Sequence, residues 1–466
     1  MSFALNSVGF NNTNNVGSIS KKTHYNNVSF NHNVPSNPLT PSIPYVSPIK
    51  FNSTLSNSDI QKYTFLVNYL KDVPPNGNSE GLLATQQLDL LLKNGKLLAR
   101  SLNNNSTTLD NLCDIATYER AYGVDAKKIL CDTLDLLVNP RFVTQQFGDV
   151  PDEEVQNILS MQPENSEVLK NPSLMNVEAS GVCPAASLEV NAADKYPAEF
   201  TEWISKLSSK DKQINWQIDL KAINSNPLDA LNILNALKTP YTDFNFKKNK
   251  LNISLDMNSY IREQIQAKYW DPGERNTADV LFQGAIMGLG SQATYNALID
   301  WRAPIFNENT QGLVEVEKTL VESIFKNKEI TSLVYQQIDE NQNLVGYTCP
   351  FSKIQKHLTD TLDSGDDVII GYVLTNETSG RTSSSSYNQS VDGKPNKVIN
   401  GHEITIVGYN KDIKGNVNFI CVDTDDNSQD YVIYSADWLI PKIHHAGYPA
   451  HIVKNDEEEI MKKLVA

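Results

Sequence analysis

Cys183 stands in the first stretch of this sequence whose residue types suggest chemistry. It is followed by Pro184 and by the small residues 185–187, and a helical pattern then continues toward Trp203. Proline suits the first turn of a helix, because its missing N–H would have no acceptor there. The free N–H groups and the positive end of the helix dipole favour a thiolate at such a position. The stretch therefore marks Cys183 as a candidate nucleophile, with a structural, packed cysteine as the alternative.

A histidine and an acid follow far downstream, each beside a strand pattern. His402 opens the alternating segment 401–410, and the next strand pattern, residues 417–422, runs into Asp423. If the two strands pair, the Asp423 side chain can reach back to the His402 ring. A thiol becomes a nucleophile when a base takes its proton, and an imidazole suits that task because its pKa lies near neutrality. A third group then fixes the tautomer and orientation of the ring.

These requirements give each residue a role. Cys183 is the expected nucleophile, His402 the general base and later the general acid, and Asp423 the group that orients His402. Two residues compete with Asp423 for the orienting role. They are Asp425, which lies two positions on and faces the same side, and Asn427, which offers an amide.

The order of these residues resembles that of the papain-like cysteine peptidase superfamily. In that order a cysteine begins a helix, a histidine begins a strand, and an acid or amide ends the next strand, as do Cys183, His402 and Asp423. The chain is most similar to the bacterial branch that includes the peptidases trimming double-glycine leaders, and the resemblance covers roughly residues 170–452. It implies an α+β fold in which the helix carrying the cysteine packs on an antiparallel sheet carrying the histidine. The implied activity is thiol hydrolysis of a peptide or isopeptide bond through an acyl-enzyme on Cys183.

The residues before the cysteine depart from the papain pattern. Papain relatives place an oxyanion-stabilising glutamine a few residues before the nucleophile, whereas residues 176–180 read Asn-Val-Glu-Ala-Ser. Asn176 is one candidate replacement, and the more distant Gln162 is another. The backbone N–H of Cys183, at the start of its helix, supplies one oxyanion donor in either case.

Several segments of different composition surround these residues. We expect a disordered Asn- and Ser-rich tail, a helical domain, a papain-like domain with a large helical insertion, and a charged C-terminal tail. These occupy residues 1–57, 58–165, 166–455 with the insertion at about 205–330, and 456–466. The tail has too few long apolar side chains to offset the entropy of ordering it. The helical domain is interpreted either as a scaffold or interaction module or as an autoinhibitory pro-region.

Strand patterns replace helical patterns after the insertion. Residues 333–347 predict a hairpin around the polar turn 339–341, and the apolar run 367–374 predicts a buried strand. Residues 375–400 are rich in Ser, Gly and Asn. This loop precedes His402, and we interpret it either as a lid over the site or as a surface excursion.

Composition argues against several classes of function. The 466 residues carry a formal charge of −15 and few basic clusters, which disfavours nucleic acid or an anionic membrane as a partner. The sequence has no apolar run long enough to predict a membrane span and no signal-peptide pattern. Its five cysteines are scattered and odd in number, so they do not form a disulfide framework. We therefore expect a cytoplasmic protein, or one exported without a cleaved signal peptide.

Three further motifs do not support a cofactor or a metal. The glycines within residues 284–290 belong to a helical pattern rather than to a loop after a strand, which rules out a dinucleotide fingerprint. Residues 423–434 begin like a calcium loop but lack its glycine and its final glutamate. The histidines within residues 444–451 lack a good ligand spacing. We expect no cofactor and no metal site.

Two other functions remain open beside a peptidase. One is a transferase or cell-wall amidase on the same fold. Amidases of papain type usually carry a second histidine as the third member, and the sequence offers Asp423 at that position. The other is a catalytically inactive papain-like protein that binds a partner. The expected partner of an enzyme is a peptide or protein substrate.

Overall fold

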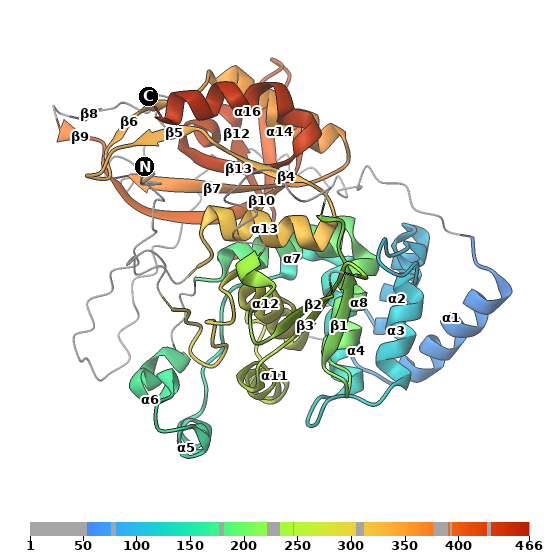
Figure 1. Ribbon diagram of the computed structural model, residues 1–466. Coiled ribbons are helices and arrows are strands. Elements are labelled where there is room, and N and C mark those ends of the chain that lie inside the picture. The colour runs from blue at the N-terminus through green and yellow to red at the C-terminus, as the bar shows by residue number, and fades with distance from the viewer. Residues whose placement is uncertain are drawn as a thin grey trace.

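The computed structural model in Figure 1 mixes helices with antiparallel strands, which places the chain in the α+β class. It describes residues 54–75, 81–176, 181–220, 234–245, 247–303, 312–375, 390–391, 394–425 and 430–465. The tail predicted at residues 1–57 therefore lies almost entirely outside the described residues. Most of the serine-rich loop predicted at residues 375–400 also lies outside them.

The first described region is helical, as the sequence predicts for residues 58–165. Its helices are α1 (Asn57–Leu70), α2 (Ala84–Lys93), α3 (Thr108–Thr117), α4 (Ala126–Val138), α5 (Asp152–Met161) and, just after it, the short α6 (Glu167–Lys170). Capping boxes begin α1 and α3, where Ser56 pairs with Asp59 and Thr107 with Asp110. Such reciprocal bonds satisfy N–H groups that a helix leaves unpaired at its start.

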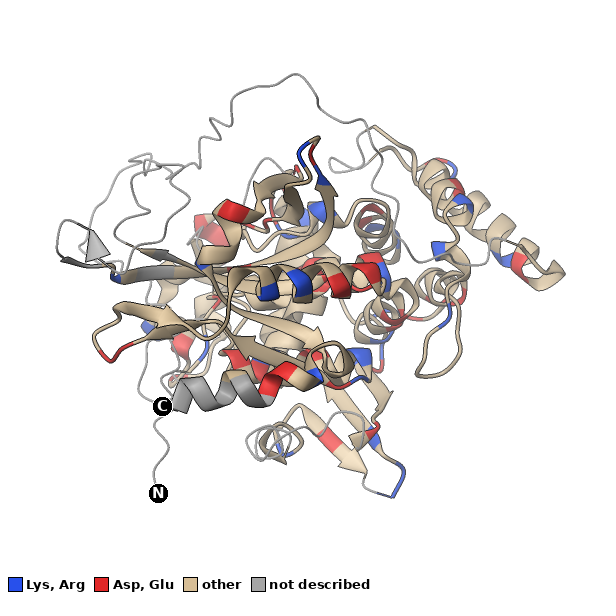
Figure 2. Ribbon diagram, turned by 90° about the horizontal axis from the view of Figure 1, so that it is seen from above, with Lys and Arg blue, Asp and Glu red and all other residues tan. Residues whose placement is uncertain are grey.

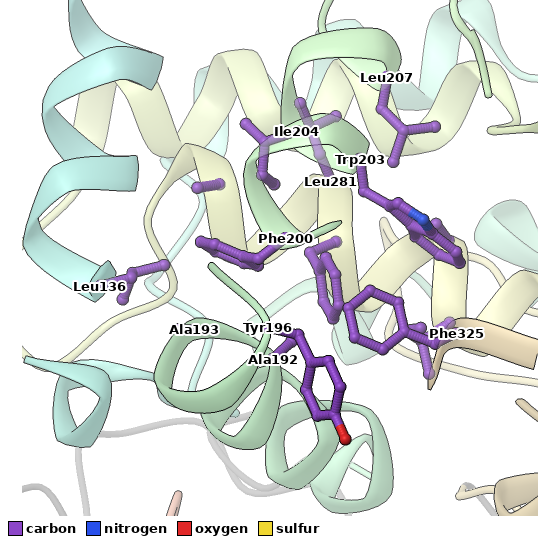
Figure 3. Close-up of a cluster of buried hydrophobic side chains, with 14 of the residues drawn as sticks. Leu136, Ala192, Ala193, Tyr196, Phe200, Trp203, Ile204, Leu207, Leu281 and Phe325 are labelled. Carbon is purple, nitrogen blue, oxygen red and sulfur yellow. The ribbon is translucent and has the colours of Figure 1, made fainter. Parts of the chain in front are cut away.

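This helical region does not have a hydrophobic core of its own in the structure. Buried side chains of α1 to α4 belong to the same apolar cluster as those of α7 (Cys183–Lys195), α8 (Pro197–Leu207) and α12 (Thr277–Gly290). Figure 3 shows part of this cluster, with Leu136 of α4 on the side of Phe200 of α8, and with Trp203 of α8 and Leu281 of α12 in the same cluster. Removing the helical region would therefore expose apolar surface on the rest of the chain.

Helix α7 lies at the centre of the molecule. Every residue from Pro184 to Lys195 is buried, and alanines at four of these positions let neighbouring elements approach closely. Its buried polar side chains have partners on other elements. Lys195 forms an ion pair with Asp367 at 3.2 Å, and Asn191 donates a hydrogen bond to Asp366 at 3.0 Å. These contacts hold the helix that presents Cys183 at its first residue.

The insertion predicted as helical at residues 205–330 contains strands as well, so that part of the prediction is wrong. Strands β1 (Gln213–Gln217), β2 (Thr242–Asn245) and β3 (Lys250–Ser254) form a small antiparallel sheet in the order β1-β3-β2. Buried Ile214 and Trp216 alternate with more exposed polar residues along β1. The strands are only four or five residues long, so the alternation of polar and apolar residues in β1 and β3, although present in the sequence, is a short signal. Helices α11 (Met257–Tyr269), α12 and α13 (Glu315–Lys326) complete the insertion.

A larger antiparallel sheet carries His402 and leads into Asp423. Within the described residues its order is β12-β11-β10-β7-β13-β4, built from β4 (Ile330–Val334), β7 (Val368–Thr375), β10 (Val398–Lys411), β11 (Val417–Val422), β12 (Val432–Ser435) and β13 (Ile443–Pro449). The predicted strands are present, and β10 extends four residues before His402. The strand β13 was not predicted, because its sequence IHHAGYP combines histidines, glycine and proline rather than alternating apolar residues.

Helices cover both faces of this sheet (Figure 1). Ile369 of β7 belongs to the apolar cluster of α7, whereas the adjacent Ile370 packs with α14 (Phe351–Asp363), as the alternation of strand side chains requires. A hairpin surrounds the turn 339–341 and uses the predicted second strand, β6 (Leu344–Tyr347), but its first strand is β5 (Gln336–Ile338). The predicted first strand, residues 333–335, is wrong, because residues 333 and 334 belong to β4 and pair with β13. The tail predicted at residues 456–466 continues α16 (Ala450–Val465), which also packs on the α14 side.

The remaining described segments are short. They comprise α15 (Ala436–Leu439) and the strand pair β8 (Ser390–Val391) and β9 (Lys394–Pro395). None of the described helices is long and apolar enough to cross a membrane. In Figure 2, acidic and basic positions are interspersed along the helices rather than separated by sign.

Candidate active site

Cys183 occupies the position that the sequence predicts for a reactive thiol. It is the first residue of α7, and Pro184 follows it within the first turn. All five cysteines lie in the described residues and none forms a disulfide; four are buried, and Cys183 is the partly exposed one. Burial raises the pKa of Cys113 and of Cys131 to about 12, which makes those thiols poor nucleophiles at neutral pH.

The structure brings His402 and Asp423 into direct contact. His402 lies in β10, and Asp423 is the residue immediately after the neighbouring strand β11. The Nε2–H group of His402 donates to Oδ1 of Asp423 over 2.7 Å. The two side chains are only 14% and 8% exposed, so water screens their interaction weakly. The ring of Tyr372, opposite His402 on β7, packs edge-on against the imidazole with ring centroids 5.8 Å apart.

The thiol of Cys183 lies near enough to the same imidazole to contribute to the shift of its pKa. Because Asp423 occupies Nε2, Nδ1 is the ring nitrogen left for the sulfur. Burial lowers the pKa of His402, but the Asp423 carboxylate and then the Cys183 sulfur outweigh it, so the pKa is raised well above its ordinary 6.5. The three residues that the sequence places far apart therefore form one coupled unit.

Asp425 has a different role from the one that the sequence left open for it. Its backbone N–H donates to Oδ1 of Asp423 at 3.1 Å, and its carboxylate accepts a hydrogen bond from Gln145 Nε2 at 2.8 Å. Gln146 Nε2 donates to the same carboxylate oxygen. Asp425 thus connects the 144–146 segment to Asp423, while Asp423 is the residue on the ring. Asn427, the third candidate, lies outside the described residues.

Sequence reasoning missed these two glutamines. Gln145 and Asp425 are 280 positions apart, and no local pattern links them. The backbone N–H of Gln145 also donates to the carbonyl of Thr424 at 3.0 Å. The segment after α4 therefore helps to hold the turn that carries Asp423.

Neither side chain proposed for the oxyanion site is positioned by a contact with Cys183. The amide of Asn176 pairs with the backbone of Val150, accepting from its N–H at 2.7 Å and donating to its carbonyl at 3.1 Å. Gln162 follows the end of α5 and accepts a hydrogen bond from Ser166 at 3.0 Å. The backbone N–H of Cys183 lies in the first turn of α7, where the helix supplies no acceptor for it. It remains the oxyanion donor that the fold itself offers.

No protein-family model and no curated protein matches this chain. The function must therefore be inferred from the arrangement of Cys183, His402 and Asp423.

Proposed function

We propose that this chain is a cysteine peptidase with a papain-like core, which cleaves a peptide or isopeptide bond through an acyl-enzyme on Cys183. The observation that carries the proposal is the His402 imidazole held between the Asp423 carboxylate and the Cys183 thiol. A buried carboxylate on one ring nitrogen fixes the tautomer, so that the other nitrogen faces the sulfur. The proposal also rests on α7 meeting β10 of the antiparallel sheet, where Thr405 donates to the Ser187 carbonyl at 2.8 Å.

The reaction would begin with transfer of the thiol proton to Nδ1 of His402. The thiolate attacks the carbonyl carbon of the scissile bond, and the negative charge that develops on oxygen is stabilised by the backbone N–H of Cys183. The imidazolium then gives its proton to the leaving amine, the C–N bond breaks, and a thioester remains on Cys183. Asp423 stabilises the imidazolium in this interval without taking its proton.

Hydrolysis of the thioester reverses the roles. His402 removes a proton from water, the resulting hydroxide attacks the thioester, and the C–S bond breaks to release a carboxylic acid. The proton on His402 returns to the sulfur. In a transferase, an amine would replace water in this step. The carboxylate of Asp423 on the ring supports the peptidase over an amidase of the kind that uses a second histidine.

Covalent labelling tests the proposal most simply. The full chain is treated at neutral pH with a thiol-directed peptidyl probe, and the modified residue is located by mass spectrometry. We expect one label on Cys183, lost in Cys183→Ala, slowed in His402→Asn and unchanged in the control Cys113→Ser. Equal labelling of the wild type and Cys183→Ala would contradict the proposal.

A substrate test separates the enzyme from an inactive binding protein. The wild-type chain is incubated with a peptide library, and the new termini are identified by mass spectrometry. We expect cleavage that Cys183→Ala abolishes. Labelling of Cys183 together with new amide bonds to added amines, instead of cleavage, would indicate the transferase.

A further inference from the structure

Two adjacent histidines on β13 and a glutamate of α13 converge behind the catalytic strand. One ligand atom from each of Glu315, His444 and His445 lies within 4.8 Å of the other two. His444 and His445 are 6% and 2% exposed, and their Nδ1 atoms are 2.9 Å apart. Glu315 is only half buried, so the cluster can be reached from solvent at that residue.

A second carboxylate orients one of these rings. The Nε2–H group of His445 donates to Oε1 of Glu403 at 3.1 Å, and Glu403 is in turn paired with the Lys318 ammonium at 3.3 Å. Because His445 donates from Nε2, its Nδ1 accepts the hydrogen bond from Nδ1–H of His444 in this structure. A metal ion would take the place of that proton and bind both Nδ1 lone pairs once His444 holds its proton on Nε2 instead.

The sheet is shaped to admit the His445 ring. A Cβ atom on Gly371 of β7 would lie 2.2 Å from Cε1 of His445 and 2.7 Å from its Nε2. The glycine within the apolar strand 368–375 therefore lets the imidazole lie across the backbone and reach Glu403 on β10. A side chain at position 371 would displace the ring from this place.

The charges around the cluster balance in favour of a cation. Lys318 contributes one positive charge, and the carboxylates of Glu315 and Glu403 contribute two negative charges. The site has a net negative charge before a metal ion enters.

We propose that Glu315, His444 and His445 bind a divalent transition metal ion such as zinc. Two imidazoles and one carboxylate form a ligand set that zinc accepts, with water in the fourth position. Two nitrogens bound to one tetrahedral zinc lie roughly 3.3 Å apart, so the two Nδ1 atoms need to separate by only a few tenths of an ångström. The bound ion would join α13 to β13 and, through Glu403, to β10 beside His402.

The sequence spacing argued against this site, because the third ligand lies far upstream of the two histidines. The sequence feature that could have indicated a closely packed side chain here is Gly371, a glycine within a mostly apolar strand.

The test uses untagged full-length protein carrying Cys183→Ala. This substitution prevents zinc from binding to the Cys183–His402 pair and adding to the measured stoichiometry. Zinc binding is measured without any activity assay, so a failure of the proposed function would not change the result. After treatment with a chelator, the protein is titrated with zinc by calorimetry, and cobalt serves as a spectroscopic probe of four-coordinate ligation. We expect about one equivalent to bind and the melting temperature to rise with zinc concentration.

Variants in the same background decide which residues bind. Glu315→Gln and His444→Asn should each weaken zinc affinity at least tenfold, and Glu403→Gln, which acts through His445, should weaken it roughly 10–100-fold. The control His451→Asn alters an exposed histidine of α16 and should bind zinc like the parent. If the parent binds no zinc, or if Glu315→Gln and His444→Asn bind as tightly as His451→Asn, the proposal is overturned. Circular dichroism confirms that each variant is folded.

Discussion

At the candidate active site, two largely enclosed ionisable side chains face each other. Nε2 of His402 and Oδ1 of Asp423 are 2.7 Å apart, and the pKa of His402 is raised well above its ordinary value despite burial. In the helical core, Glu263 of α11 is enclosed to a similar degree but neither of its carboxylate oxygens has a hydrogen-bond partner among the described residues. Burial, together with Asp132 and Asp125, raises the pKa of Glu263 to about 8. Burial is therefore compatible with a charged His402 in the first region, whereas in the helical core it favours the neutral form of Glu263.

Helix α7 contributes a residue to both regions. Its first residue, Cys183, meets His402, whereas Glu189, within the same helix, is held neutral because burial raises its pKa to about 8. Gln283 donates a hydrogen bond to Glu189 at 2.9 Å, but a neutral donor does not replace an opposite charge. For His402, Glu263 and Glu189 the difference follows a counter-charge within contact distance rather than exposure to water. Asp367 is an exception, because burial raises its pKa to about 8 although it pairs with Lys195.

Removing the nucleophile should have the largest effect. Cys183→Ala should lower the rate of peptide cleavage by at least about 10⁴-fold, because the acyl-enzyme can no longer form. Cys183 is only partly buried, so the melting temperature should change little. Cleavage assays and thermal unfolding measure the two quantities. Activity within tenfold of the wild type would mean that Cys183 is not the nucleophile.

Weakening the counter-charge at His402 should have the next largest effect. Asp423→Asn keeps the shape of the side chain but removes the charge, and kcat should fall by about 10²–10⁴-fold. Because Asp423 raises the pKa of His402, the variant should lose its proton at lower pH, and the alkaline limb of the rate profile should shift downward. The kcat/KM profile from pH 5 to 10 measures this shift. An unmoved alkaline limb would contradict the role of Asp423.

Replacing the unpartnered acid should stabilise the fold at alkaline pH. The pKa of Glu263 is about 8 in the folded chain and 4.5 ordinarily, so the folded state holds its proton more tightly and stability falls as pH rises between these values. Glu263→Gln removes this loss. The unfolding free energy of the variant minus that of the wild type should therefore increase by on the order of 2 kcal/mol between pH 5 and pH 8. Urea unfolding across this range measures it.

The exposed Glu119, which pairs with Lys210, provides the matched control for that change. Glu119→Gln should leave the pH dependence of stability close to that of the wild type. Parallel stability curves for Glu263→Gln and the wild type would show that Glu263 is ionised at neutral pH and would remove the contrast between the two regions.

The smallest effect on catalysis is expected from replacing Gln146, which contacts Asp425 rather than any of the three proposed catalytic residues. Gln146 is half-buried and donates to Asp425, whose N–H supports Asp423. Loss of one such hydrogen bond in Gln146→Ala should lower kcat roughly two- to fivefold without altering the melting temperature. Steady-state kinetics beside thermal unfolding separate positioning from stability. A fall in melting temperature that accounts for the lost activity would assign Gln146 a purely structural role.

The parts of the site that local sequence predicts are those set by local physics. Pro184 placed Cys183 at a helix start, and α7 begins there. The apolar run 417–422 predicted the strand after which Asp423 lies, and β11 has these bounds. The choice between Asp423 and Asp425 was not decidable from the sequence, because both follow the same strand and only packing determines which one meets the ring.

The features that sequence reasoning missed depend on contacts between distant segments. The bonds from the two glutamines to Asp425 and the approach of Glu315 to the β13 histidines have no local signature. The strand β13 was hidden because its residues are buried on both sides, and its histidines have polar partners instead of following an alternating pattern. Tertiary packing overrides local pattern in these places.

The most direct test of the account is the protonation of His402 itself. Nuclear magnetic resonance of histidine-labelled protein follows each imidazole with pH, and His402→Gln assigns the signal. We predict that His402 in the wild type loses its proton at a pH well above 6.5, and that Asp423→Asn and Cys183→Ala each lower its pKa. A wild-type His402 that titrates at or below 6.5, with no response to either substitution, would contradict the coupled Cys183–His402–Asp423 unit.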